Sequence, residues 1–212
     1  VQTGVATLSG QGCLLPTRLL VEDTVYDEVV DLVVDLSESL VVGDPFSEET
    51  IMGPVVSAPH CERILGVIER ARQESAGDLL TGGVRLGGDL APGYYIAPTV
   101  FGNVDNASHL AQNEIFGPVL SVLRFRSEAE AIQIANGTRY GLAGYLHTRD
   151  LARAHRVADG LQAGYVAVNG FPLLPPNAPF GGMKASGYGR EGGREGLDEF
   201  LQTKNVFVNL DP

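Results

Sequence analysis

Residues 114–130 read EIFGPVLSVLRFRSEAE and contain the end of a loop, a strand and the start of a helix. Val119–Phe125 is a short, mostly apolar run of the kind that forms a buried strand. Ser127 and Glu130 then have the spacing of a capping box, which opens a helix, and Gly137 suits its end. A strand that leads directly into a capped helix is typical of a crossover connection between parallel strands.

The same succession of strand-like and helix-like segments continues on both sides of this stretch. Apolar residues at helical spacing predict a helix within residues 22–40, and Ser57 can cap a second helix. Further strands are expected at 79–81, 94–100, 144–148 and 163–169, with helices after Asp150 and at 194–201. We therefore predict an α/β fold: a mostly parallel twisted sheet flanked by helices. A last strand at 205–210 is expected to pair with another chain.

Composition excludes several classes of protein. The 212 residues include 15 basic and 26 acidic side chains, a net charge of -11, which argues against nucleic acid or an anionic membrane as a partner. No apolar run is long enough to span a bilayer, and no signal-peptide pattern is found. The only two cysteines, Cys13 and Cys61, favour a reducing, cytoplasmic compartment over a disulfide scaffold. No metal site is expected.

Cys13 is the candidate nucleophile. It follows Gly10-Gln11-Gly12, and glycines beside a cysteine let the backbone approach a substrate closely. The thiolate is the attacking species, and the Cys13 amide N–H is suited to stabilising an oxyanion. The alternative is a structural cysteine, because free cysteines are among the most buried residues. Cys61 lies within a predicted helix and is interpreted as structural.

Glu114 and Phe116 are the candidate cofactor-binding residues. They precede a rigid Gly117-Pro118 pair and the predicted strand, which places them at the mouth of a sheet. An ionised carboxylate can accept hydrogen bonds from two hydroxyl groups. The alternative is a loop carboxylate and a core aromatic residue, since aromatic side chains are commonly buried.

Taken together, these segments resemble the aldehyde dehydrogenase superfamily. Its Gly-Gln-x-Cys segment matches Gly10 to Cys13, although the Phe and Asn that usually precede it are Ala6 and Leu8 here. Glu-Ile-Phe-Gly-Pro-Val matches residues 114–119. The stretch 177–192, NAPFGGMKASGYGREG, matches the family's Gly-rich segment almost residue for residue. The resemblance covers residues 5–210.

The resemblance implies a role for each of these residues. Cys13 attacks an aldehyde, which is oxidised to a carboxylic acid through a thiohemiacetal and a thioester, with NAD or NADP as hydride acceptor. Glu114 binds the ribose hydroxyls and Phe116 packs on the nicotinamide ring. Phe171, Leu173 and Leu174 lie where family members line the substrate tunnel. Lys184 and Arg190 are interpreted as structural donors, and Asn169 as a strand-end residue that helps hold the catalytic loop.

The resemblance also shows which parts of the family pattern have no match here. Complete members are more than twice as long, and most of the cofactor is bound by a domain that precedes the cysteine. The general-base glutamate of a Leu-Glu-Leu-Gly-Gly-Lys segment and an oxyanion-binding asparagine are not found. We therefore expect a catalytic domain at 1–202, truncated at its N-terminus, that is inactive by itself. Residues 203–212 are expected to form the strand that links subunits in a dimeric or tetrameric homo-oligomer.

Two other functions stay open at this point. The chain can be a non-catalytic assembly or binding module that retains the fold, although such a module needs neither Cys13 nor Glu114. It can also be a cysteine-dependent acyl-transfer protein without a cofactor, although none of the four histidines lies in a recognisable Cys-His motif.

Overall fold

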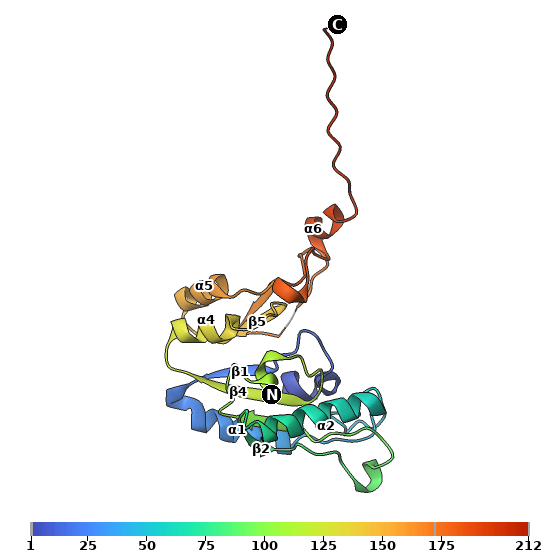
Figure 1. Cartoon of the computed structure of the whole chain (residues 1–212), viewed down its shortest axis with the longest axis vertical. Helices are drawn as coiled ribbons and strands as arrows, with labels where there is room; N and C mark the ends of the chain where they lie inside the picture. Colours follow the sequence, from blue (N-terminus) through green and yellow to red (C-terminus); the bar gives the residue numbers. More distant parts are fainter. Residues whose placement is uncertain (1, 172, 212) are drawn as a thin grey trace.

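A computed structural model describes residues 2–171 and 173–211 of the chain. Its strands form a four-stranded sheet in the order β1-β4-β3-β2 and a separate two-stranded sheet, β5-β6 (Figure 1). The strands are β1 (Arg18–Glu22), β2 (Asp78–Thr81), β3 (Thr99–Gly102), β4 (Val119–Phe125), β5 (Ala143–Leu146) and β6 (Tyr165–Val168). The helices are α1 (Tyr26–Glu38), α2 (Ala58–Gln73), α3 (His109–Gln112), α4 (Glu128–Asn136), α5 (Leu151–Gly160) and α6 (Gly193–Asp198).

The prediction of a mostly parallel sheet flanked by helices is confirmed. β4 pairs in parallel with both β1 and β3, and β5 pairs in parallel with β6. β2 is antiparallel to β3, and the strands fall into two sheets, which the sequence pattern did not predict. The strand expected at 94–100 forms later, at Thr99–Gly102. The stretch before it pairs with residues 84–86, which belong to no named strand, through an isolated bridge between Arg85 and Ile96 and flanking backbone hydrogen bonds.

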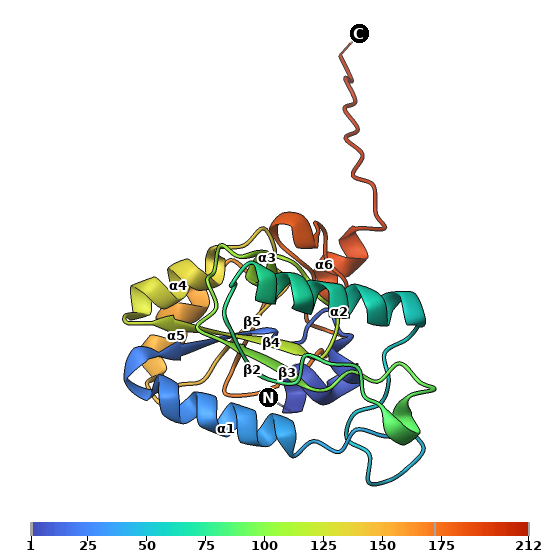
Figure 2. The ribbon, with the colours of Figure 1, turned by 60° about the horizontal axis from the view of Figure 1, so that its bottom comes forward.

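The larger sheet is buried on both faces, which explains the continuous apolar run of β4. Alternate residues of a strand point to opposite faces, so Val119 and Leu123 pack with the α2 side of the core and Leu120 and Val122 with the α1 side. Figure 2 shows α1 and α2 on opposite sides of the sheet. α2 begins as the sequence indicates, since Ser57 accepts a hydrogen bond from the His60 N–H at its start. α1 lies within the expected range of residues 22–40.

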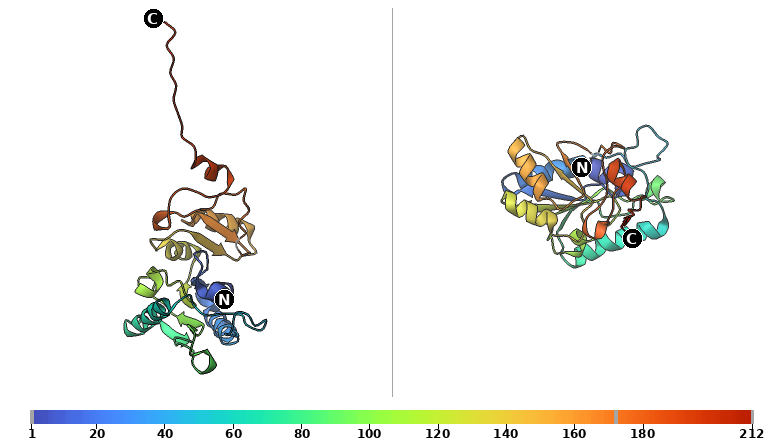
Figure 3. Two further views of the ribbon diagram at one scale, coloured as in Figure 1. Left: turned by 90° about the vertical axis from the view of Figure 1, so that its right-hand side faces the viewer. Right: turned by 90° about the horizontal axis from the view of Figure 1, so that it is seen from above.

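The β5-β6 pair, α4 and α5 form a second layer above this sheet (Figure 3). Two cations bind the C-terminal end of α4, where backbone carbonyl groups lack helical partners, and the first of them joins this layer to the larger sheet. The Arg18 guanidinium, from β1, donates to the Ile134 carbonyl at 2.8 Å. Lys184 Nζ, from the Gly-rich segment, donates to the carbonyls of Asn136 and Thr138 at 2.9 and 3.0 Å.

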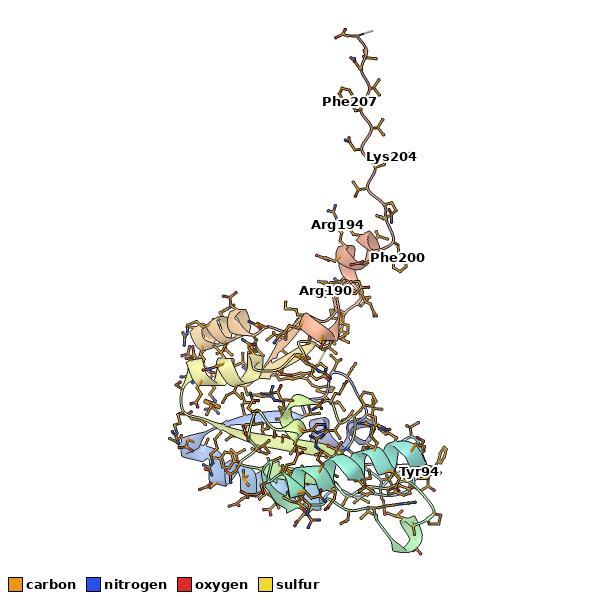
Figure 4. The ribbon with its side chains drawn as sticks, viewed as in Figure 1. Tyr94, Arg190, Arg194, Phe200, Lys204 and Phe207 are labelled. Carbon is orange, nitrogen blue, oxygen red and sulfur yellow. The ribbon has the colours of Figure 1, made fainter. Side chains whose placement is uncertain are left out.

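The chain ends in an extended arm that leaves the body after α6 (Figures 1 and 4). The last helix covers Gly193–Asp198 instead of residues 194–201. The strand expected at 205–210 finds no partner strand within the described part of this chain, since residues 201–211 carry no regular secondary structure. Their apolar side chains, including Phe207, are exposed. Among the residues described, no helix combines the length and apolarity needed to cross a membrane.

Candidate active site

Cys13 lies exposed in a tight turn between the N-terminal helical turns and β1. The Leu15 N–H donates to the Gly12 carbonyl at 3.2 Å, which closes the turn around the cysteine. Within the described residues, the Cys13 N–H has no intramolecular acceptor. Cys13 therefore combines an accessible side chain with a backbone donor that no described acceptor occupies.

The residues before Cys13 follow an unusual backbone path. Leu8, Ser9 and Gly10 have φ values of 52°, 55° and 73°, in the left-handed region that most L-residues avoid. Side-chain hydrogen bonds hold this path: Ser9 Oγ donates to the Gly53 carbonyl at 2.8 Å. Gln11 Oε1 accepts from the Val56 N–H at 2.9 Å, and its Nε2 donates to the Leu8 carbonyl at 2.9 Å. The cysteine loop is thus tied to the segment that leads into α2.

The first turns of α2 also hold the Glu114–Phe116 turn. Phe116 adopts φ 56°, a strained value for an aromatic residue. His60 Nε2 is 2.7 Å from the Phe116 carbonyl oxygen, and Arg63 hydrogen-bonds the Ile115 carbonyl. The rings of His60 and Phe116 meet edge to face at 6.3 Å. Sequence reasoning missed His60 and Arg63; the only signal was their spacing of three, which puts them on one face of the helix.

The cysteine loop and the Glu114–Phe116 turn meet directly. Gly10 lies so close to Gly117 and Pro118 that a Cβ on Gly10 would be 2.0 Å from the Gly117 carbonyl oxygen. Gly117 is in turn covered by Ile64 of α2, since a Cβ there would be 2.5 Å from Ile64 Cδ1. The structure therefore brings the Cys13 loop and the predicted cofactor-binding turn together, with Glu114 exposed and Phe116 half-buried.

The Gly-rich segment has a structural role. Besides the Lys184 bonds to the end of α4, Arg190 donates to the Gly182 and Gly189 carbonyls at 2.8 and 2.6 Å. Both side chains are thus structural donors, as predicted. Asn169 has φ 54° and exchanges two 2.8 Å side-chain hydrogen bonds with the Thr148 backbone. It closes the β5-β6 pair, and these bonds do not reach the cysteine loop.

The predicted entrance residues are exposed. Phe171, Leu173 and Leu174 expose 52%, 77% and 45% of their surface, and such a group of neighbouring exposed apolar side chains is typical of a binding surface. The backbone of Leu173 is held by Tyr165, whose hydroxyl accepts from the Leu173 N–H at 3.1 Å. The apolar side chains of Phe171, Leu173 and Leu174 are therefore exposed to solvent.

Tyr145 is a further residue of the site that the sequence did not indicate. Its hydroxyl donates to the Leu14 carbonyl, next to Cys13, at 2.7 Å. Burial raises the pKa of Tyr145 to about 12, and the nearby Tyr165 and Cys13 add to the rise. The hydroxyl therefore stays protonated, and remains a donor, throughout the neutral range. No local pattern marks a contact between residues 131 positions apart.

Cys61 differs from Cys13 in its exposure to solvent. Its side chain is fully buried in the α2 side of the core, beside Ile64 and Ile68. Burial raises the pKa of the Cys61 thiol, which lowers the thiolate fraction at neutral pH. The interpretation of Cys61 as structural is confirmed by this burial.

The sequence and the structure of the chain are both similar to those of known proteins. The aldehyde dehydrogenase family model matches residues 1–206. A betaine aldehyde dehydrogenase of Cereibacter sphaeroides is 43% identical over 204 residues, which cover 96% of this chain and 41% of that protein. The 4-trimethylaminobutyraldehyde dehydrogenase of Homo sapiens is 41% identical, over 95% of this chain and 41% of the relative.

Solved structures agree with the sequence comparison. The betaine aldehyde dehydrogenase of Staphylococcus aureus in complex with NAD+ superposes with a TM-score of 0.94 at 39% identity. The match covers 99% of this chain and 42% of that one, so the chain spans about two fifths of the length of these relatives. A family model that matches nearly the whole sequence, together with this structural agreement, shows that the chain belongs to the aldehyde dehydrogenase family.

Proposed function

We propose that this chain supplies the nucleophile for the oxidation of a small-molecule aldehyde to a carboxylic acid. The Cys13 thiolate attacks the carbonyl carbon, and the electron pair of the C=O bond moves to the oxygen. The N–H of Cys13 stabilises this oxyanion. Loss of hydride from the resulting thiohemiacetal leaves a thioester, and its hydrolysis releases the acid and restores the thiol. The contact between Gly10 and Gly117, which brings the cysteine loop to the Glu114–Phe116 turn, is the observation that carries the proposal.

The residues of that turn fit a nicotinamide dinucleotide. Glu114 is exposed and free to accept hydrogen bonds from two ribose hydroxyls, and His60 and Arg63 fix the backbone on which it stands. The half-buried Phe116 ring offers a flat apolar surface to a nicotinamide ring. The dinucleotide, NAD or NADP, supplies the hydride acceptor when bound. A reducing, cytoplasmic compartment suits this chemistry because it keeps the thiol from oxidation.

Acylation by a chromogenic ester tests Cys13 without a cofactor. Mixed with p-nitrophenyl acetate, the chain is expected to release a burst of p-nitrophenol of about one equivalent, with the acetyl group on Cys13 by mass spectrometry. Cys13→Ala removes the burst and Cys61→Ala, the matched control, retains it. A burst that survives in Cys13→Ala, or a wild-type protein that is never acylated at Cys13, contradicts the proposal.

Oxidation itself requires residues that this chain does not contain in recognisable form. We expect it in a chimera that joins the unmatched portion of the Staphylococcus aureus betaine aldehyde dehydrogenase to this chain, because the matched portions superpose closely. Aldehyde-dependent NADH formation should disappear in Cys13→Ala while NAD+ binding persists. A chimera that binds NAD+ and oxidises aldehydes equally well without Cys13 would rule the mechanism out.

We also propose that residues 203–211 pair with a second copy of the chain in a homo-oligomer. Figure 4 shows Phe207 and Lys204 on an arm that stands away from the body. Val206, Phe207, Val208 and Leu210 expose 67–88% of their surface, and an extended segment without a partner strand is a template for pairing. Light scattering should show a lower mass for Val208→Pro than for Val208→Thr, since proline removes a ladder donor. Equal masses would contradict strand pairing.

A further inference from the structure

We propose that Tyr145 and Tyr165 are a pair of positioning residues, one for the nucleophile and the other for the aldehyde entrance. The inference rests on the proposed function and adds two residues to it. Each tyrosine hydroxyl holds the backbone of a different segment: Leu14, next to Cys13, and Leu173. Phe171, Leu173 and Leu174 are the residues proposed to form the aldehyde entrance, and are called the entrance segment. The β5-β6 pair is then the platform on which the two segments are set relative to each other.

Both tyrosines stand on the same face of the β5-β6 pair. Tyr145 is opposite Ala167 in the register of the parallel strands, and Tyr165 is opposite Ala143. Because side chains alternate across a strand, these four residues share one face. Each large ring is thus paired with an alanine, which leaves room for the ring to lie over the neighbouring strand. Figure 1 shows the N-terminal loop, in blue, reaching up to β5.

The bond of Tyr145 completes the fixation of the cysteine turn. On the N-terminal side of Cys13, Gln11 is tied to Val56 at 2.9 Å. On the C-terminal side, the Leu14 carbonyl receives the Tyr145 hydroxyl at 2.7 Å. An exposed turn that is hydrogen-bonded on one side only can move, whereas a turn that is hydrogen-bonded on both sides of Cys13 holds the Cys13 sulfur in a fixed position. The raised pKa of Tyr145 agrees with a hydroxyl that remains a donor.

Tyr165 holds the entrance segment in a different way. Its hydroxyl accepts from the Leu173 N–H at 3.1 Å and lies 3.5 Å from the Leu173 carbonyl oxygen, so one hydroxyl serves as acceptor and donor. The Tyr165 ring packs edge to face on Phe180 of the Gly-rich segment, at 6.3 Å and 66°. The Gly-rich segment therefore fixes the ring, and the ring fixes Leu173.

The two anchors predict separable kinetic effects. Loss of the Tyr145 hydroxyl displaces the attacking sulfur for every substrate, so the acylation rate constant falls and substrate binding is unchanged. Loss of the Tyr165 hydroxyl loosens the entrance wall, so binding weakens, and more so for longer acyl chains, which make more contact with it. A purely structural role would lower stability and change both parameters together.

The experiment uses single-turnover acylation of Cys13 by p-nitrophenyl acetate, butyrate and hexanoate. Tyr145→Phe should reduce the limiting rate constant about tenfold for all three esters, the loss expected from one hydrogen bond of about 1.4 kcal/mol. Tyr165→Phe should leave that rate constant unchanged and raise the half-saturating ester concentration, most for the hexanoate. Tyr188→Phe is the matched control, because Tyr188 is 99% exposed.

Hydrogen–deuterium exchange provides a readout independent of activity. Tyr145→Phe should speed exchange in peptides that cover residues 8–16 and not in those that cover 171–176, and Tyr165→Phe should do the reverse. Both variants must melt like Tyr188→Phe within a few degrees. If both variants acylate and exchange like the control, the inference is overturned while the role of Cys13 stands. Absence of wild-type acylation would instead overturn the proposed nucleophile, and the exchange pattern would then decide the two anchors separately.

Discussion

The backbone of Gly10 lies directly against that of Gly117, although the two glycines are more than a hundred residues apart. A Cβ on Gly10 would be 2.0 Å from the Gly117 carbonyl oxygen, far inside van der Waals contact. Gly10 also has φ 73°, which an L-residue adopts at a cost. Only a residue without a side chain lets the cysteine loop touch the Glu114–Phe116 turn, so this contact explains why a glycine stands three positions before Cys13.

Gly10→Ala is therefore expected to lower the free energy of unfolding by about 2–4 kcal/mol, through a steric clash and a strained backbone. Gly66→Ala is the matched control, because Gly66 lies inside α2 and a Cβ there would meet no atom within 4 Å. That control should gain about 0.5–1 kcal/mol from better helix propensity. Urea unfolding of both variants measures the contrast, and equal changes would contradict the close packing of Gly10.

Leu8→Asn is expected to stabilise the protein. Leu8 has φ 52°, and its side chain is 68% exposed, so little apolar burial is lost on replacement. The left-handed conformation costs a residue such as leucine about 1–2 kcal/mol, and asparagine tolerates it better. We expect a gain of about 0.5–1 kcal/mol in urea unfolding. Leu36→Asn, at an exposed position inside α1, should show no such gain, because helical φ values give asparagine no advantage.

Iodoacetamide should distinguish the two cysteines. Cys13 is exposed, whereas Cys61 is fully buried and burial raises the pKa of its thiol. Since the thiolate is the reactive species, native protein at neutral pH should carry one adduct, at Cys13, and protein unfolded in urea should carry two. Peptide mass spectrometry locates the adducts. Equal labelling of Cys61 in the native state would mean that the α2 side of the core opens readily.

The ion pair between Glu128 of α4 and Arg156 of α5 should be lost in acid. Glu128, in the first turn of α4, accepts two 2.9 Å hydrogen bonds from Arg156, which lowers the pKa of that carboxyl below its ordinary 4.5. A carboxyl with a lowered pKa in the folded state stabilises the protein above its unfolded pKa, and the contribution disappears as the pH falls through the folded value.

Glu128→Gln should accordingly melt at a lower temperature than wild type at pH 7, and the gap should close as the pH falls below about 4.5. Glu48→Gln, in an exposed loop, is the control and should show no gap at either pH. If the difference in melting temperature between Glu128→Gln and wild type persists unchanged in acid, the effect of the substitution comes from helix capping and not from the ion pair.

Sequence patterns that involve only neighbouring residues correctly predicted strand β4 and the start of helix α4. The apolar run at Val119–Phe125 is β4 with the expected bounds, and Ser127 caps α4 as its spacing to Glu130 indicates. Hydrogen bonds of this kind join residues three or four positions apart, so a sequence window contains both partners. For the same reason Cys13, Glu114 and Phe116 were identified as candidates from short motifs.

The sheet arrangement and part of the site depend on contacts between residues that are far apart in the sequence. Whether β2 runs parallel or antiparallel to β3, and where the sheet divides, depends on which edges meet after the chain has folded. The roles of His60 and Tyr145 depend on hydrogen bonds across 56 and 131 positions. The sequence by itself thus determined the candidate residues of the site, because short motifs contain them. Only the tertiary structure decided which backbone groups His60 and Tyr145 bind, because a hydrogen bond requires its partners to be close in space.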